Sequence, residues 1–399
     1  MYTVTRRRPL CRDQGDCLLQ KQPHVLVLGL GIAGSSIAAT LAANGIQVTA
    51  FEQFTALHEH GSSHGDTRIY RRVPHEGAVY VEMATSSWIG WREWSKMAGE
   101  RLLVECGGID AGPAGSPIVR ASEKLARDYG QACEMMTGAT LNHRYPHYNL
   151  PPDWEVAYQP GGGFVRPDAT RTFLHKMARS AGATLLHETR VVDINLHSSG
   201  VTLRTEQESV SGDMLIVAAG SWLSRLLPQL EIPLATERRV LAWFKPERSE
   251  ALSDGRLPIF LMDNDGGWYG MPTPEGLLKL GHDKHFGEQI NSDQPAIEPG
   301  EADAAKLMPC VERYFKGFAS KPAAMKTCIY TITPDHHFII DRHPGNANVI
   351  LFSCCSGHGF KYAPAYGTIA LDLVTGKSRE DLAALGIKPS GNRITRYIS

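Results

Sequence analysis

The chain has 399 residues, of which 42% are hydrophobic, and its formal net charge is −1. This length allows a sizeable buried core and predicts two or three domains, or two interleaved ones. A nearly neutral chain is not expected to bind nucleic acid or a membrane surface by general electrostatic attraction. No apolar run reaches the roughly 20 residues that a membrane-spanning helix needs. We therefore expect no nucleic-acid partner and no membrane.

Residues 1–22 contain the run RRR but lack the apolar core of a secretory signal, so we interpret them as an arm outside the fold. An organelle-targeting segment is the weaker alternative, because Asp13 and Asp16 count against it. The eight cysteines show no metal-ligand spacing such as CxxC, so we expect no metal site. Reduced thiols are typical of a cytoplasmic protein, and we predict that location.

The stretch from residue 24 to residue 52 carries the strongest motif. A short apolar run leads into the turn GLGIAG, an alanine-rich helix follows, and a second strand ends on Glu52. The glycines would permit a tight turn, backbone approach to a pyrophosphate and close helix packing, and they are Gly29, Gly31 and Gly34, with Ile32 and Ala33 between them. The helix N-terminus favours phosphate, and Glu52 is spaced to bind ribose hydroxyls. This predicts dinucleotide binding without separating FAD from NAD.

The polar loop at residues 61–72 reads GSSHGDTRIYRR and carries three arginines. It either lies along a flavin or pyrophosphate or is a solvated basic loop. Arg68 and Arg71 are three residues apart, so one helical turn would place them on the same side. Residues 79–98 follow with a helical pattern, and the spacing of their tryptophans indicates core packing.

Residues 214–227 predict a buried strand, the turn Ala218-Ala219-Gly220 and a helix. That turn either passes near a dinucleotide or is an ordinary strand-to-helix turn. Residues 238–285 alternate in β fashion with many aromatics, which predicts an antiparallel sheet suited to walling a substrate pocket. Lys279 has apolar neighbours in this sheet, so it either extends to solvent, the favoured interpretation, or is a functional buried amine.

The C-terminal part predicts a helix at 301–317 and strand-like residues at 325–345, which include Cys328. A lone cysteine in a strand is usually a small core side chain. A buried strand at 348–352 leads to the turn SGHGFK and a helix that ends near residue 373. Such a helix N-terminus, with Lys361 beside it, predicts a second anion-stabilising site, while a histidine such as His358 is more often structural.

These motifs together resemble the monomeric sarcosine oxidase and N-methyl-L-tryptophan oxidase family of flavoprotein amine oxidases. GLGIAG, SSHGDTRIYRR, IVAAGSW, LKLG, KTCIYT followed by DHHFIIDRHP, and SGHGFK occur in the family's order and spacing. The resemblance covers nearly all of residues 24–377.

The resemblance implies a mixed α/β (α+β) fold in which a Rossmann-like FAD-binding domain is interleaved with an antiparallel-sheet substrate domain. This is the architecture of the D-amino acid oxidase and sarcosine oxidase superfamily. The FAD-binding domain would comprise residues 23–90, 158–232 and 332–385, and the substrate domain 91–157 and 233–331. Residues 386–399 would form a C-terminal tail.

The resemblance also implies how FAD is held. The motif glycines and Glu52 would bind the ADP half, Val191 would contact the adenine region, and Cys328 would carry the flavin covalently through its sulfur at the 8-methyl position. Three loop residues would lie along the approach to the flavin, namely Ser63, His64 and Thr67. Two turns would complete the site, and their residues are Ala219, Gly220 and Trp222 in the first and Gly357, His358, Gly359, Phe360 and Lys361 in the second.

Four cations have implied roles in the reaction. Arg71 and Lys361 match the pair that grips the substrate carboxylate, which suits a guanidinium and an ammonium. Lys279 and Arg68 match residues on the opposite flavin face, where a cation can stabilise the charge that develops as dioxygen reacts. Backbone N–H groups near His358 would stabilise the anionic reduced ring, and Tyr330 would border the substrate pocket.

Several positions depart from the family pattern. A histidine normally follows the glycine of LKLG by two residues, and here either His282 or His285 could fill that place, or neither. Trp268 stands where sarcosine oxidases have a tyrosine, and nearby pocket residues are replaced by Leu261 and Met262. These changes concern the substrate rather than the chemistry.

We therefore expect a monomeric FAD-dependent oxidase of a secondary amine that carries a carboxylate, such as sarcosine or another N-methyl amino acid. A hydride would pass to flavin N5, the imine would hydrolyse to aldehyde and amine, and O2 would reoxidise the flavin to give H2O2. One alternative is an oxidase of a cyclic imino acid of the pipecolate or proline type. The other is a dehydrogenase or flavin-binding module without oxidase turnover.

Overall fold

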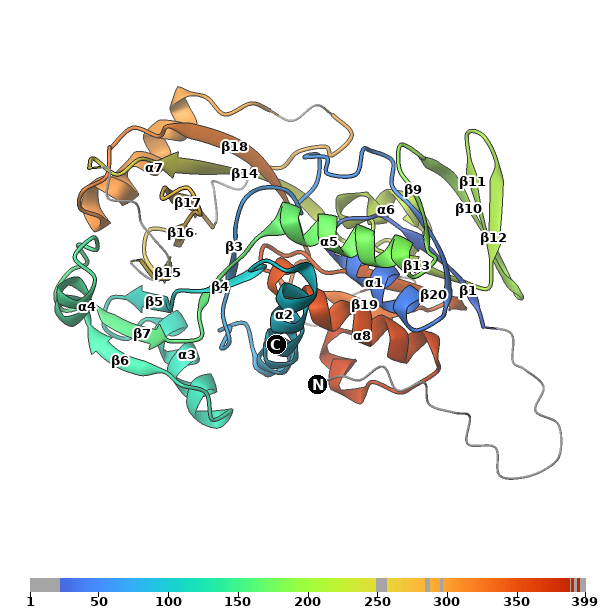
Figure 1. Cartoon of the computed structure of the whole chain (residues 1–399), viewed down its shortest axis with the longest axis horizontal. Coiled ribbons are helices and arrows are strands. Elements are labelled where there is room, and N and C mark those ends of the chain that lie inside the picture. Colours follow the sequence, from blue (N-terminus) through green and yellow to red (C-terminus); the bar gives the residue numbers. More distant parts are fainter. Residues whose placement is uncertain are drawn as a thin grey trace.

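The computed structural model describes residues 22–248, 257–283, 288–294 and 297–387, and the backbone of 389–390 and 393–394. Two lobes lie side by side, one built on a largely parallel sheet and the other on a larger, mostly antiparallel sheet (Figure 1). The predicted N-terminal arm lies almost wholly outside the described residues, and so does His285. The mixed α/β fold class predicted from the sequence is confirmed.

The parallel sheet contains the predicted dinucleotide unit in its centre. Its strand order is β19-β20-β13-β1-β2-β9, and all neighbours except β19 and β20 pair in parallel. Short β-branched apolar runs suit strands that are buried on both faces. The strands are β1 (His24–Leu28), β2 (Gln47–Phe51), β9 (Thr184–Leu186), β13 (Met214–Val217), β19 (Ile339–His343) and β20 (Asn346–Ser353).

Helices cover one face of this sheet and a small antiparallel sheet covers the other. The helices are α1 (Ile32–Ala43), α2 (Ala78–Ala98), α5 (Pro167–Ser180) and α8 (Ala363–Val374), and α1 packs between α5 and α8. Trp91 and Trp94 of α2 are buried in this core, as their spacing predicted. The small sheet consists of β10 (Val191–His197), β11 (Gly200–Thr205) and β12 (Ser209–Gly212), next to α6 (Leu223–Leu226).

The second lobe is an eight-stranded sheet in the order β18-β14-β17-β16-β15-β5-β7-β6. The antiparallel pairing predicted for residues 238–285 is confirmed, and only β15 and β5 pair in parallel. Its strands are β5 (Gly108–Gly112), β6 (Glu134–Thr137), β7 (Glu155–Gln159), β14 (Ala235–Phe244), β15 (Ile259–Met262), β16 (Trp268–Pro272), β17 (Leu278–His282) and β18 (Ala324–Ile332). Its helices are α3 (Pro117–Asp128), α4 (Gly138–Arg144) and α7 (Glu301–Tyr314).

A three-stranded sheet connects the lobes, with β8 (Gly163–Val165) between β3 (Arg68–Tyr70) and β4 (Leu103–Glu105). The predicted domain boundary after residue 90 falls inside α2, and residues of α2 on both sides of that position pack in the same hydrophobic core. The remaining boundaries stay predictions. The short elements are η1 (Gly220–Trp222), η2 (Pro228–Leu230), η4 (Phe360–Tyr362), η5 (Glu380–Leu385), β21 (Pro389–Ser390) and β22 (Arg393–Ile394).

None of the helices in the described ranges has both the length and the apolar character needed to cross a bilayer. Four cysteines of the described ranges are free thiols, namely Cys133, Cys310, Cys328 and Cys355. Within those same ranges no group of three or more His, Cys, Asp and Glu side chains is arranged to hold a metal ion.

Gly34 sets the distance between α1 and β1. A Cβ atom at this position would lie 1.8 Å from the carbonyl oxygen of Gly29, which is backbone and has no room to yield. We predict that Gly34→Ala lowers the apparent Tm by about 1–4 °C, because overpacking of this kind costs about 1–3 kcal/mol. Gly300→Ala is the matched control, since a Cβ there meets nothing within 4 Å. Equal Tm values for the two variants in thermal unfolding would contradict this role of Gly34.

Candidate functional site

The turn between β1 and α1 forms one wall of a large cavity. Gly29 has φ of +96°, which favours glycine, and its N–H donates to the Phe51 carbonyl at 2.8 Å. Gly31 is the N-cap of α1, and the next N–H, that of Ile32, donates to Ser63 Oγ at 3.0 Å. Because Gly31 has no side chain, the helix N-terminus and its partial positive charge open directly onto the cavity.

Glu52 lines the same cavity at the end of β2. Its carboxylate accepts the N–H groups of Leu30 at 3.0 Å and Phe54 at 3.1 Å. Burial opposes ionisation, but a hydrogen bond and the charge of His58, with these two N–H groups, hold the pKa of Glu52 below its usual value. The carboxylate is therefore ionised at neutral pH and keeps lone pairs for a hydroxyl donor.

This first cavity has a volume of about 660 Å³ and runs from the α1 turn past β10 to the turn after β20. It is large enough for an elongated ligand such as a dinucleotide. The site residues predicted from the sequence that line it are Gly29, Gly31, Ile32, Ala33, Glu52, Ser63, Arg68, Val191, Ala219, Gly220, Trp222, Tyr330, Gly357, Gly359 and Phe360.

A second cavity of about 460 Å³ adjoins the first, and both are lined by Arg68, Tyr330, Gly357 and Phe360. It lies between the two lobes, with walls from β3, β16, β17, β18 and the turn before α8. The other predicted residues that line it are Thr67, Arg71, Lys279, Cys328, His358 and Lys361. Residues predicted to hold a flavin and residues predicted to act on a substrate thus share one continuous space.

Cys328 lies where the two cavities meet. Its side chain is 3% exposed, and its Sγ accepts a hydrogen bond from Arg68 Nη2 at 3.7 Å. On the same strand, the hydroxyl of Tyr330 donates to Tyr269 at 3.0 Å.

Lys279 is buried, as the family resemblance implied, so the interpretation from the residues alone that it extends to solvent is wrong. Its Nζ donates to Asp66 Oδ1 at 2.5 Å and to the Thr67 carbonyl at 3.0 Å. Trp243 donates to the other Asp66 oxygen at 2.7 Å, and its ring lies 4.8 Å from Nζ. Burial and the charge of Arg68 lower the pKa of Lys279 to about 8, and Asp66 opposes that shift.

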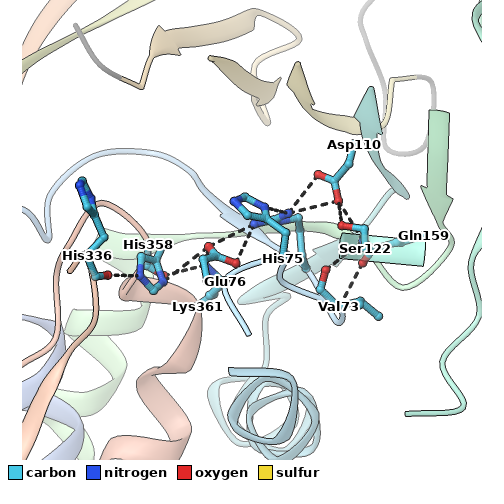
Figure 2. A network of polar contacts seen from close by, with 10 residues as sticks. Val73, His75, Glu76, Asp110, Ser122, Gln159, His336, His358 and Lys361 are labelled. Carbon is cyan, nitrogen blue, oxygen red and sulfur yellow. Dashed lines mark hydrogen bonds and ion pairs between the residues drawn. The ribbon is translucent and has the colours of Figure 1, made fainter. Parts of the chain in front are cut away.

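Arg71 is 2% exposed and is bound by two carboxylates. Its Nη1 lies 3.0 Å from Asp110 Oδ1, and its Nη2 lies 3.1 Å from Glu76 Oε2. Nη1 also donates to His75 Nδ1 at 3.0 Å, so that nitrogen is an acceptor and the imidazole is neutral. Figure 2 shows His75 and Glu76 between the Asp110 end of this network and the His358 end.

Lys361 completes the network. Its Nζ donates to the His358 carbonyl at 2.8 Å and lies 3.5 Å from Glu76 Oε1. Burial lowers the pKa of Lys361 to about 8, an effect that Glu76 opposes and Arg71 reinforces. Burial also lowers the pKa of His358 to about 3, so its ring is neutral at physiological pH, and it bonds to the His336 carbonyl at 3.2 Å.

Arg68 and Arg71 contact different groups. One helical turn would have placed them on the same side, but this segment is not helical. The backbone at 68–70 is β3, and in an extended strand neighbouring side chains alternate rather than repeat every three or four residues. Arg68 therefore contacts Cys328 and the Ser62 carbonyl, whereas Arg71 contacts the acids described above.

Three predicted site residues do not line either cavity. Gly34 packs inside the α1 turn. His282 bonds through Nε2 to the Asp265 carbonyl at 2.6 Å and stacks edge-on against Trp268, so its ring supports the strand rather than the cavity. His64 is 1% exposed, and neither of its ring nitrogens has a hydrogen-bond partner among the described residues. Burial, with nearby cations, lowers the pKa of His64 to about 2.

The sequence argument missed the side-chain partners of the cations, which are Asp66, His75, Glu76 and Asp110. Two of them carried a usable signal. Asp66 belongs to the conspicuous loop GDTR, and Asp110 is a single acid in the apolar strand GGIDAG. An acid in a buried strand needs a compensating charge, so Asp110 predicted a cation nearby but not which one. His75 and Glu76 lie in a loop that nothing in the sequence singled out.

Comparison with known proteins gives consistent results. The DAO family model, described as FAD dependent oxidoreductase, matches residues 24–373. Monomeric sarcosine oxidase from Bacillus sp. (strain B-0618) is 32% identical over 371 residues, which cover 91% of this chain and 95% of that protein. N-methyl-L-tryptophan oxidase from Salmonella dublin is 30% identical over 359 residues, covering 89% of this chain and 95% of that protein.

Solved structures agree in fold. The crystal structure of L-proline dehydrogenase from P. horikoshii has a TM-score of 0.80 to this chain at 19% identity. The match covers 92% of this chain and 97% of that one.

Proposed function

The chain belongs to the DAO family of FAD dependent oxidoreductases, and we propose that it oxidises a secondary amine that carries a carboxylate, such as sarcosine or another N-methyl amino acid. One observation carries the proposal. Two cation pairs, Arg68 with Lys279 and Arg71 with Lys361, line the second cavity, and all of them except the half-buried Arg68 are buried. One pair suits a substrate carboxylate and the other suits the charge that forms as dioxygen is reduced.

The first cavity has the features that FAD requires. The N-terminus of α1 and the glycine turn would hold the pyrophosphate, and ionised Glu52 would accept ribose hydroxyls. Cys328, where the cavities meet, would carry the flavin covalently.

Bound FAD would supply the two-electron acceptor for a hydride from the carbon next to the amine nitrogen, with O2 as final acceptor and H2O2 as product. The chain's own residues position the reactants. Arg71 and Lys361 would orient the substrate carboxylate, and the apolar side chains of Leu261 and Met262 would border the rest of the substrate. We further infer a monomer, as the sarcosine oxidase relatives are named.

The first experiment tests cofactor and substrate together. We expect the purified protein to be yellow, and acid precipitation to leave the colour in the pellet for the wild type but not for Cys328→Ser. A peroxide assay should detect turnover of sarcosine or another N-methyl amino acid, and about 10-fold or greater loss with sarcosinamide, which lacks the carboxylate. Peroxide from pipecolate or proline alone would favour the cyclic imino acid alternative. Fast reduction of an artificial acceptor without peroxide would favour a dehydrogenase.

In Lys279→Met, we expect the substrate to reduce the flavin at the normal rate. Reoxidation of the flavin should be about 100-fold slower or worse, because loss of one group that stabilises a developing anion lowers the rate by about that factor. Stopped-flow mixing of the reduced enzyme with dioxygen measures this step alone. Lys245→Met is the matched control, since Lys245 is exposed just beyond β14 of the same sheet. Normal reoxidation of Lys279→Met would remove Lys279 from the oxygen step.

The two half-reactions should respond to pH in opposite directions. The amine reacts in its neutral form, so reduction should become faster as pH rises through the substrate pKa. Lys279 has a pKa of about 8 and is charged only below it, so reoxidation should slow as pH rises through about 8. Separate stopped-flow pH profiles test both slopes, and reoxidation that is flat from pH 6 to 10 would contradict the second.

A further inference from the structure

Two carboxylates, not one, bind Arg71, and their settings differ. Asp110 is fully buried on β5, within the regular sheet of the second lobe. Glu76 has a side chain that is 14% exposed, and it lies in the connection between β3 and α2. One partner is therefore part of a rigid element and the other belongs to a loop.

Asp110 is itself held firmly. Ser122 of α3 donates to its Oδ2 at 2.5 Å, and Gln159 of β7 donates to the same oxygen at 3.2 Å. Gln159 also exchanges two hydrogen bonds with the backbone of Val73, at 3.1 Å and 3.0 Å. The residues that fix the carboxylate thus also fix the chain just after Arg71 (Figure 2).

The charges in this network already balance. Arg71 and Lys361 supply two positive charges, Glu76 and Asp110 supply two negative charges, and His75 and His358 are neutral. A ligand carboxylate would add an uncompensated buried negative charge, which is strongly unfavourable. One of the two acids must therefore give up its place, and Glu76 is the one with solvent access.

The guanidinium has a free group ready for this exchange. Asp110 and His75 bind Nη1, Glu76 binds Nη2, and Nε is buried and has no hydrogen-bond partner among the described residues. When Glu76 leaves, Nε and Nη2 together present the side edge of the guanidinium, which matches the two oxygens of a carboxylate. Lys361 remains within reach of the same place.

We propose that Asp110 is a positioning residue that fixes Arg71 for the substrate carboxylate, and that Glu76 is the temporary partner this carboxylate displaces. The inference rests on the proposed function, because it assumes that the ligand is a carboxylate. It assigns opposite effects to two acids that touch the same guanidinium. Loss of Glu76 removes a competitor, whereas loss of the Asp110 charge frees Arg71 to turn and leaves Glu76 as its only anionic partner among the described residues.

The test uses the holoenzyme and titrates acetate and acetamide, following the flavin absorption spectrum. We expect Glu76→Gln to bind acetate about tenfold more tightly than wild type, and Asp110→Asn about tenfold more weakly, consistent with the strength of a charged hydrogen bond. Acetamide affinity should change less than about twofold in both variants. Ser122→Ala should weaken acetate binding, as Asp110→Asn should. This second variant keeps the proposal testable if Asp110→Asn fails to fold.

Asp263→Asn is the matched control, because Asp263 accepts from Ser116 just beyond β15 and lines neither cavity. It should leave acetate affinity unchanged. With an amine that the enzyme oxidises as substrate, Asp110→Asn should raise KM and lower kcat, while Glu76→Gln should lower KM.

Two outcomes overturn the inference. The first is that acetate binds to Asp110→Asn as tightly as to wild type, or more tightly. Asp110 would then only offset the charge of Arg71 and would not position it. The second is the absence of acetate binding to wild type. Failure of every amine to give peroxide overturns the proposed function instead, and it leaves the comparison of acetate affinities intact.

Discussion

The burial of three cations around one cavity is the constraint on which the site depends. Lys279, Lys361 and Arg71 are each no more than 3% exposed, and an isolated charge at such depth would be strongly unfavourable. Each is therefore matched by an acid, Asp66 for Lys279 and Glu76 or Asp110 for the others. Arg68 instead contacts backbone carbonyls and Cys328.

The ion pairs also connect the two lobes. Asp66 comes from the loop that follows the dinucleotide unit, and it binds Lys279 of β17 in the eight-stranded sheet. Arg71 follows β3 and binds Asp110 of that same sheet. The charged groups that line the cavity thus also hold its two sides together. Because breaking one member of a buried pair leaves the other uncompensated, the geometry and the electrostatics of the site cannot vary independently.

Local features of the chain were predictable where physics acts over short range. The glycine turn, the strands around it and the antiparallel run at 238–285 follow from periodicity and from turn chemistry, and the structure agrees with them. The helical turn considered for Arg68 and Arg71 does not form, because a long-range interaction decides the structure there. Pairing with β8 made that short segment a strand, and such long-range pairing overrides local spacing.

The sequence alone determined the dinucleotide unit, the family resemblance and most of the residues that line the two cavities, because each of these is encoded in a contiguous motif. Tertiary structure alone decided that His282 supports a strand, and that Asp110 and Glu76 both bind Arg71. These facts depend on which segments meet in space. A pairing between residues 39 positions apart, such as Arg71 with Asp110, leaves no periodic trace in the chain.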